Sequence, residues 1–221
     1  MMISIAIDGP SGAGKSTLAR ALSEKLGYLY LDTGAIYRTV ALSIMKKGAS
    51  VRDEETVISL IPSINIEIKH IEGKQHMYID GEDVTDKIRT NEISANASAV
   101  SAIPKIREFL LELQRDYARK NNVIMDGRDI GTVILPNATV KFFMTASNDA
   151  RAERRHKELC EKGEVITIDE VKRTMAERDK NDSTRKVAPA IPASDAIMLD
   201  NSGAFEETVN KALEIIRSKT E

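Results

Sequence analysis

The sequence predicts an α/β fold in which helices cover both faces of a parallel sheet, giving three layers. Two observations lead to this prediction. Short apolar runs rich in β-branched residues alternate along the chain with segments that have helical spacing. A glycine-rich loop joins the first apolar run to the first helix. Strands that alternate with helices are joined by right-handed crossovers, which make the sheet parallel and place a ligand beyond the carboxyl ends of its strands.

The composition limits the classes of function. The chain has 221 residues, 42% hydrophobic and 30% charged, which is enough for one globular domain with inserted lobes. A net charge of −2 gives no indication of a nucleic-acid or membrane partner. No apolar stretch approaches the roughly 18 residues of a membrane span, and residues 1–9 lack the features of a signal peptide. With Cys160 as its only cysteine the chain forms no intrachain disulfide, and we expect a cytoplasmic protein.

The first strand, loop and helix carry the most specific motif. Ile3–Ile7 is an apolar run, and Lys15–Gly27 has helical spacing that ends at a glycine. Between them the chain matches G-x-x-x-x-G-K-[ST], a loop that binds the phosphates of a nucleoside triphosphate. The residues predicted to contact the triphosphate are Gly9, Pro10, Ser11, Gly12, Ala13, Gly14, Lys15, Ser16 and Thr17.

Each residue type in this motif has a physical role. Glycines allow the backbone N–H groups to turn inward around phosphate oxygens, and the helix N-terminus adds partial positive charge. Lys15 is expected to reach the β- and γ-phosphates, and Ser16 to ligate Mg²⁺. The alternative is a chance glycine-rich turn, and the flanking strand and helix argue against that interpretation. The motif does not distinguish a kinase from a GTPase or a motor.

Three further apolar runs are expected as core strands. Asn122–Asp126 ends in an acid, and Asp126 stands where a carboxylate would hold Mg²⁺ through a bound water. The alternative for Asp126 is an ordinary strand followed by an Asp-Gly turn. Thr139–Ser147 and Ala196–Ser202 complete these strands, and Ala204–Ser218 is an amphipathic closing helix.

Two segments interrupt this alternation. Ile64–Thr85 alternates apolar and polar residues, with turn signals at Glu72–Gly73 and Asp80–Gly81, so residues 62–90 are expected to form a small antiparallel β-rich insert. Arg151–Glu164 is highly charged. Its three arginines, Arg151, Arg154 and Arg155, lie on one helical face. The alternatives for this helix are a solvated surface or a mobile lid over the triphosphate.

Arginines and acids recur at expected strand ends and turns, in "LDTGAIYR", "DGRD" and "ERDKNDSTR". Two bound nucleotides bring many negative charges into one cleft, and arginines both clamp phosphate oxygens and stabilise charge in the transition state. A switch GTPase needs no second nucleotide site, and the chain has no N-K-x-D base-reading motif. Phosphoryl transfer is therefore favoured.

Taken together, "GPSGAGKST", "LDTGAIYR", "GEDVTDKIRTNEIS", "DGRDIGTVILP" and "VAPAIPASDA" resemble the bacterial-type cytidylate kinase family over nearly the whole chain. The resemblance implies an adenylate-kinase-like P-loop fold with a five-stranded parallel sheet, an inserted β-rich monophosphate-binding lobe and a lid. It implies transfer of the γ-phosphoryl group of ATP to CMP or dCMP, with Mg²⁺. The expected parts are a core of residues 1–35, 105–150 and 170–221, a lobe of about 36–104 and a lid of about 151–169. We expect a monomer.

The resemblance also implies roles for single residues. Lys15, Arg128 and Arg154 are expected to be catalytic, and Arg151 and Arg155 to bind ATP beside the phosphate loop. Thr33 stands where the family usually has serine near the pyrimidine. The residues expected to bind CMP are Thr33, Arg38, Ser98, Arg107, Arg128, Asp129, Arg178, Asp182 and Arg185, and Ser16 with Asp126 (via water) is expected to hold the metal.

The base assignment has a chemical reason. The Asp129 carboxylate only accepts hydrogen bonds, so it favours the amino group of cytosine over the carbonyl of uracil, while Arg107 donates to ring acceptors. The alternative for this pair is a structural ion pair. Two other functions stay open: a kinase for a different small-molecule acceptor, and a nucleotide-binding switch without an acceptor. An acceptor panel separates the first, and arginines that point away from a common cleft would favour the second.

Overall fold

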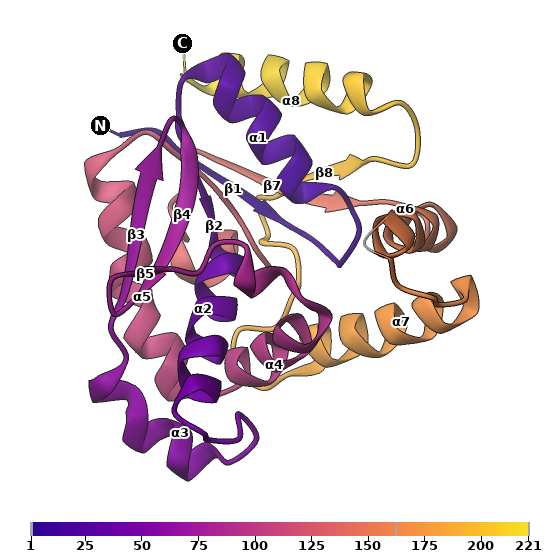
Figure 1. Cartoon of the computed structure of the whole chain (residues 1–221). Coiled ribbons are helices and arrows are strands. Elements are labelled where there is room, and N and C mark those ends of the chain that lie inside the picture. Colours follow the sequence, from indigo (N-terminus) through magenta and orange to yellow (C-terminus); the bar gives the residue numbers. More distant parts are fainter. Residues whose placement is uncertain (1, 162, 221) are drawn as a thin grey trace.

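A computed structural model gives the structure of residues 2–161 and 163–220. At its centre is a five-stranded sheet in the order β2-β6-β1-β7-β8, and every neighbouring pair is parallel (Figure 1). The predicted α/β class and parallel sheet are confirmed. The strands are β1 (Ser4–Asp8), β2 (Leu29–Asp32), β6 (Val123–Asp126), β7 (Val140–Thr145) and β8 (Ile197–Asp200).

Alternate residues of the strands face two separate cores, which produces the three layers. Ile5 and Ile7 of β1 pack with α1 (Lys15–Leu26) and α8 (Phe205–Thr220) on one face of the sheet. Ala6, between them, packs with α2 (Thr33–Lys46) and α5 (Pro104–Lys120) on the other face. This two-residue alternation follows from strand geometry, and burial on both faces explains why β1 is apolar throughout.

The fifth strand, β2, is the one that sequence patterning did not delimit. It has only four residues, and it passes into α2 without a linker. Asp32 makes this junction by capping α2, because its carboxylate accepts a hydrogen bond of 2.8 Å from the backbone N–H of Ala35. The short junction brings the first turn of α2 to the carboxyl edge of the sheet.

The expected β-rich insert is confirmed as a three-stranded antiparallel sheet of β3 (Ile66–Ile71), β4 (Lys74–Ile79) and β5 (Glu82–Asp83). Glu72 and Gly73 have φ of 50° and 75°, and Asp80 and Gly81 have 50° and 82°. Positive φ at both central residues is typical of the tight type I′ turn that matches strand twist. The remaining elements of this part are α3 (Glu54–Leu60), η1 (Ile61–Ser63), η2 (Lys87–Arg89) and α4 (Asn91–Ser101).

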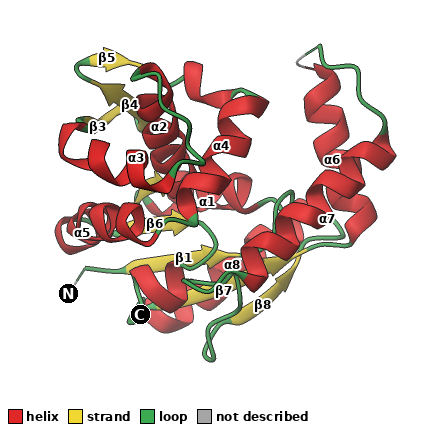
Figure 2. Cartoon of the chain, turned by 90° about the horizontal axis from the view of Figure 1, so that it is seen from below, coloured by secondary structure: helices red, strands yellow, loops and turns green. Residues whose placement is uncertain are grey.

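Two helices, α6 (Asn148–Glu161) and α7 (Ile168–Thr184), pack side by side and extend away from the sheet (Figure 2). They have a small core of their own, formed by Ala152, Leu159, Val171 and Met175. The segment expected as a lid, residues 151–169, covers most of α6 and the connection, whereas its packing partner α7 lies almost wholly beyond it. Along the described part of the chain, no helix combines the length and apolar character that crossing a membrane requires.

Candidate active site

One cleft opens at the carboxyl edge of the central sheet, with a volume of about 560 Å³, which is in the range of small-molecule sites. The phosphate loop, the start of α2, α4, and the α6–α7 pair all contribute to its walls. The predicted site residues that line it are Ser11, Gly12, Gly14, Lys15, Ser16, Thr17, Thr33, Arg38, Ser98, Arg107, Asp126, Arg128, Asp129, Arg154, Arg155, Arg178, Asp182 and Arg185. Gly9, Pro10, Ala13 and Arg151 do not line it.

Two glycines of the phosphate loop are required by close packing. Gly9 has φ of 144°, and a Cβ there would lie 2.1 Å from the backbone oxygen of Met144. Gly14 has φ of 96°, and its Cβ would lie 2.6 Å from Nδ2 of Asn201. Asn201 also donates a 2.9 Å hydrogen bond to the carbonyl of Ala13. The loop is thus fixed against β7 and the segment after β8 before any ligand binds.

Lys15 is buried at the first turn of α1, and its Nζ donates a 2.7 Å hydrogen bond to the carbonyl of Pro10. Burial, followed by repulsion from the nearby Arg128 guanidinium, lowers the pKa of Lys15 to about 7. Both causes act against the charged ammonium in the absence of a ligand. An anion placed against Lys15 would offset both and restore the charged form.

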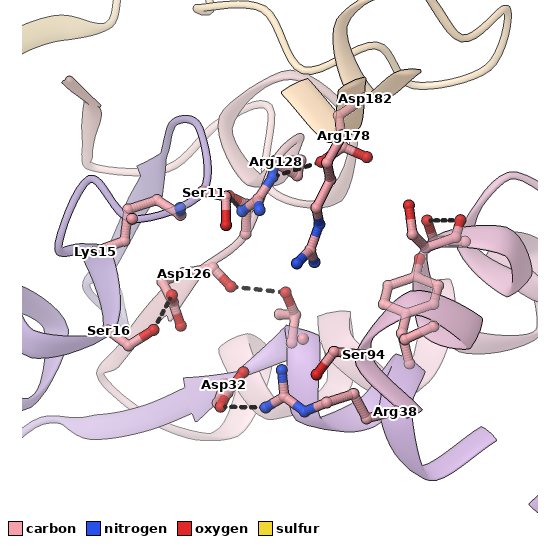
Figure 3. Close-up of a pocket in the computed structure, with 18 of the residues that line it drawn as sticks. Ser11, Lys15, Ser16, Asp32, Arg38, Ser94, Asp126, Arg128, Arg178 and Asp182 are labelled. Carbon is pink, nitrogen blue, oxygen red and sulfur yellow. Dashed lines mark hydrogen bonds and ion pairs between the residues drawn. The ribbon is translucent and has the colours of Figure 1, made fainter. Parts of the chain in front are cut away.

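Ser16 and Asp126 meet as the sequence predicted, with Ser16 Oγ donating 2.8 Å to Asp126 Oδ2 (Figure 3). The Tyr30 hydroxyl donates 2.7 Å to the other carboxylate oxygen. Burial raises the pKa of Asp126, and repulsion by Asp32 adds to this effect. Within the described ranges, no three His, Cys, Asp or Glu side chains gather into a metal-binding group.

The side chains of Arg38, Arg128 and Arg178 point into the middle of the cleft (Figure 3). Arg38 Nη2 donates 3.0 Å to Asp32, and Arg128 Nε donates 2.9 Å to Asp182. The Nε atoms of Arg38 and Arg178 are buried without a hydrogen-bond partner. The pKa of Arg178 is lowered to about 10, mainly by burial and secondly by repulsion from Arg128. Buried donors without partners, together with mutual repulsion, indicate a space built for an anion.

At the other end of the cleft, Asp129 lies buried between two arginines. Arg107 pairs with Asp129 Oδ2, and Arg185 Nη2 donates 3.3 Å to Oδ1. Arg107 also donates 3.1 Å to the carbonyl of Ser101, and its guanidinium lies 5.6 Å from the ring centroid of Tyr37. The carboxylate is therefore held in one orientation, and each of its oxygens keeps capacity for a second donor.

Thr33 and Ser98 line the cleft at different depths. Thr33 is buried, and its hydroxyl donates 2.7 Å to the backbone carbonyl of Asp126. Its hydroxyl hydrogen is occupied there, so toward a ligand Thr33 offers a lone pair or its methyl group. Ser98 is half-buried on α4, and its backbone carbonyl accepts from Ser101 Oγ.

The three arginines expected on the lid occupy two different environments. Arg154 donates 2.6 Å to the carbonyl of Asn201, and Arg155 donates 2.8 Å to Asn91 Oδ1 at the start of α4; both line the cleft. The structure does not bring Arg151 into the cleft. It is buried behind the phosphate loop, with its Nη atoms donating to Ser11, Asp179 and Asn148.

Several lining residues were missing from the sequence-based prediction. Ser94 and Ser101 stand four residues before and three residues after Ser98, so helical spacing alone places all three on the inner face of α4. Asp32 and Gly34 lie within the "LDTGAIYR" stretch, and Asp32 is the acidic partner of the predicted Arg38. The other missed lining residues are Arg20, Tyr37, Arg89, Ala97, Gly127 and Glu158.

Comparison with known proteins agrees with this geometry. Residues 5–218 match the family described as cytidylate kinase. The cytidylate kinase of Caldicellulosiruptor bescii is 46% identical over 214 residues, which are 96% of this chain and 95% of the relative. That of Carboxydothermus hydrogenoformans is 47% identical over 218 residues, 98% of each chain.

Two solved structures share the fold at low identity. An uncharacterized protein from Eubacterium ventriosum aligns with a TM-score of 0.55 at 13% identity, over 99% of each chain. The shikimate kinase of Bacteroides thetaiotaomicron aligns with a TM-score of 0.50 at 13% identity, over 98% of this chain and 99% of its own. These two similarities show the fold, while the family match and the near-full-length relatives show the lineage. The chain belongs to the cytidylate kinase family of nucleotide kinases.

Proposed function

We propose that the protein transfers the γ-phosphoryl group of ATP to CMP or dCMP, giving ADP and CDP or dCDP, with Mg²⁺ as cofactor. One observation carries this proposal. A single cleft has a phosphate loop at one end and a carboxylate clamped by two arginines at the other, with arginines that have free donors between them. A switch protein needs only the first of these features.

The phosphate loop is the donor site in this proposal. Its N–H groups and the N-terminus of α1 surround the ATP phosphates, and Lys15 contacts the β- and γ-phosphates. The neighbouring arginines that would complete the triphosphate site are Arg154 and Arg155, which line the cleft from α6.

Mg²⁺ fits the residues that are present. The Ser16 hydroxyl is a hard oxygen ligand, and the buried Asp126 carboxylate 2.8 Å from it can hold a metal-bound water. Two protein groups match the usual preference of Mg²⁺ for a few carboxylate or hydroxyl contacts plus water and phosphate oxygens. When bound, the ion neutralises charge on the transferring phosphates.

The transfer itself needs positioning more than acid–base chemistry. An oxygen of the acceptor monophosphate attacks the γ-phosphorus, a P–O bond forms, and the bond to the β–γ bridging oxygen breaks to release ADP. The attacking oxygen is already anionic, so no general base is required. Arg38 and Arg128 hold the acceptor phosphate, while Lys15, Arg128 and Arg154 stabilise the charge that spreads over the γ-phosphoryl oxygens.

The clamped carboxylate selects the base. Asp129 accepts from the cytosine amino group, and Arg107 donates to the ring acceptors, with Arg185, Ser98 and Thr33 around the base. Because a uracil carbonyl would face the Asp129 carboxylate, UMP leaves a buried acceptor opposite an acceptor. Arg178 and Asp182 line the same cleft, and we assign them to the ribose.

The proposal includes a division of labour between parts of the chain. Residues of about 36–104 form the monophosphate-binding lobe, and the central sheet with its helices forms the core. We assign the lid to α6 together with α7, because the two helices share a core and would move as one body.

The first experiment is an acceptor panel. ADP production from ATP and Mg²⁺ is measured with CMP, dCMP, UMP, AMP and no acceptor, and Lys15→Ala serves as the control for contaminating kinases. We expect strong turnover with CMP and dCMP, weak turnover with UMP and none with AMP. ADP release that is independent of any acceptor would remove the kinase assignment and leave only the phosphate loop.

A further inference from the structure

The tip of the phosphate loop is held from behind by the α6–α7 pair. The backbone N–H of Ser11 donates 3.1 Å to Asp179 Oδ1 on α7. The backbone carbonyl of the same residue accepts 2.9 Å from Arg151 Nη1 on α6. Asp179 and Arg151 are themselves an ion pair, so one peptide segment of the loop is closed into a ring with two lid side chains.

Both Nη atoms of Arg151 are committed to protein partners in this arrangement. It is 8% exposed, Nη1 is shared between Ser11 and Asp179, and Nη2 donates to Asn148 Oδ1. Its Nε is buried without a partner. Arg154 and Arg155, on the same helix, face the cleft, whereas Arg151 does not. An arginine so bound fixes the backbone that it contacts.

Gly12 provides independent evidence that the loop rests on these helices. Its φ is 72°, and a Cβ built there would lie 2.8 Å from Met175 Cε and 3.2 Å from both the Cβ and the carbonyl oxygen of Arg151. The loop backbone therefore packs directly against both α6 and α7. Any displacement of the helix pair relative to the core must move Ser11 and Gly12 or break these contacts.

We propose that Arg151 and Asp179 form a clasp that fixes the tip of the phosphate loop and couples the position of the lid to affinity for the donor nucleotide. Both are positioning residues, which act on the triphosphate through Ser11 and Gly12. The proposal rests on the assignment of this loop as the ATP site. It differs from the expectation that Arg151 itself binds ATP, and the two make different predictions.

The kinetic test compares Arg151→Met, Asp179→Asn and the double variant. Loss of a charge-assisted clasp is expected to raise the KM for ATP about tenfold in either single variant, while the KM for CMP stays within about twofold. The double variant is expected to match the singles, because the Arg151–Asp179 ion pair is lost in either single variant and each contact to Ser11 depends on that pair. Arg151→Lys, which keeps one donor, recovers part of the loss. Arg173→Met, an exposed arginine of α7, is the matched control and leaves both KM values unchanged.

The clasp would be overturned if Arg151→Met raised the KM for ATP far more than Asp179→Asn did, and if the two effects multiplied in the double variant. That result would make Arg151 a direct ligand of ATP.

A second measurement does not depend on ATP. Amide hydrogen exchange at Ser11 in the nucleotide-free protein is expected to accelerate about tenfold in Asp179→Ala and to be unchanged in Arg173→Met. Equal exchange in all variants contradicts the clasp. A wild-type protein that is inactive in the acceptor panel refutes the proposed function, and the exchange rates then still decide the clasp.

Discussion

Asp8 shows how one buried residue organises the proposed acceptor side of the cleft. It ends β1, it is 3% exposed, and its two carboxylate oxygens accept 2.8 and 2.7 Å hydrogen bonds from the N–H groups of Ile130 and Gly131. These two residues directly follow Asp129. The carboxylate therefore fixes the start of η3 (Ile130–Ile134), and with it the orientation of the segment that carries Arg128 and Asp129.

The titration of Asp8 gives a prediction for stability. Burial raises its pKa from 3.8 to about 6, against the opposing effect of the two backbone hydrogen bonds. A raised pKa means that folding binds a proton, so stability that is present below pH 3.8 is lost as the pH rises through 6. The free energy of unfolding of the wild type, minus that of Asp8→Asn, is expected to fall by up to about 3 kcal/mol between pH 4 and pH 7.

Urea unfolding of the nucleotide-free protein at several pH values measures this difference. Asp195→Asn is the control of opposite sign, because the hydrogen bond from Lys141 lowers the pKa of the exposed Asp195. A difference between wild type and Asp8→Asn that does not change with pH would show that Asp8 titrates normally in the folded state.

At the residue scale, the sequence predicted charged side chains that line the cleft, and it missed the residues that hold those side chains in place. Lys15, Arg128 and Asp129 stand in recognisable motifs, so their presence in the cleft could be expected. The role of Asp8 depends on N–H groups more than 120 residues away, and the burial of Arg151 depends on Asp179. Spacing within a motif does not encode such long-range partners.

At the scale of elements, the phosphate loop and its two flanks form one packed unit. Gly9 is the point where the loop leaves β1, and its Cα faces the backbone carbonyl of Met144 on β7. A side chain at this position would have to displace strand backbone and not a flexible side chain. The loop conformation is therefore set by contact with the sheet as well as by glycine's conformational freedom.

Gly9→Ala and Gly27→Ala separate these two effects. Both glycines have positive φ, 144° and 69°, but a Cβ at Gly27 would meet nothing within 4 Å. Gly27→Ala is expected to lower the free energy of unfolding by about 1 kcal/mol, from backbone strain alone. Gly9→Ala is expected to cost at least about 3 kcal/mol, because overpacking against backbone adds to the strain, and to weaken ATP binding. Thermal or urea unfolding and nucleotide titration measure both. Equal losses in the two variants would show that the contact with Met144 relaxes freely.

The elements that could be predicted are those with a strong local signal. The β-hairpins were recognisable because Glu72–Gly73 and Asp80–Gly81 sit between alternating segments, and those pairs do take positive φ. The amphipathic α8 and the apolar runs of β1 and β7 were equally clear. β2 is short, ends at a helix cap and has three partly exposed residues, so its place at the sheet edge comes from pairing with β6 and not from its own pattern.

At the scale of the whole molecule, the proposed lobe and lid touch each other across the cleft. Asn91, which starts α4, accepts a 2.8 Å hydrogen bond from Arg155 on α6 and donates one to Glu164 in the segment that joins α6 to α7. Both lid partners are charged, which strengthens these contacts. Nothing in "RTNEIS" distinguishes Asn91 from an ordinary helix-start residue, so this bridge could not be expected from the sequence.

Because Asn91 alone makes both contacts, Asn91→Ala is expected to shift the nucleotide-free protein toward open arrangements, lowering the population of the bridged state about tenfold. The distance between spin labels on the exposed Cys160 of α6 and on Glu55→Cys of α3 reports this opening directly.

We expect a narrow distribution of label-to-label distances in the otherwise unchanged protein. In Asn91→Ala we expect a broader distribution that is shifted to longer distances. ATP and CMP together are expected to narrow both distributions, since bound nucleotides add contacts from both sides. Glu92→Ala, the exposed neighbour, is the control. If Asn91→Ala leaves the nucleotide-free distribution unchanged, the bridge does not hold the cleft closed, and closure depends on the nucleotides alone.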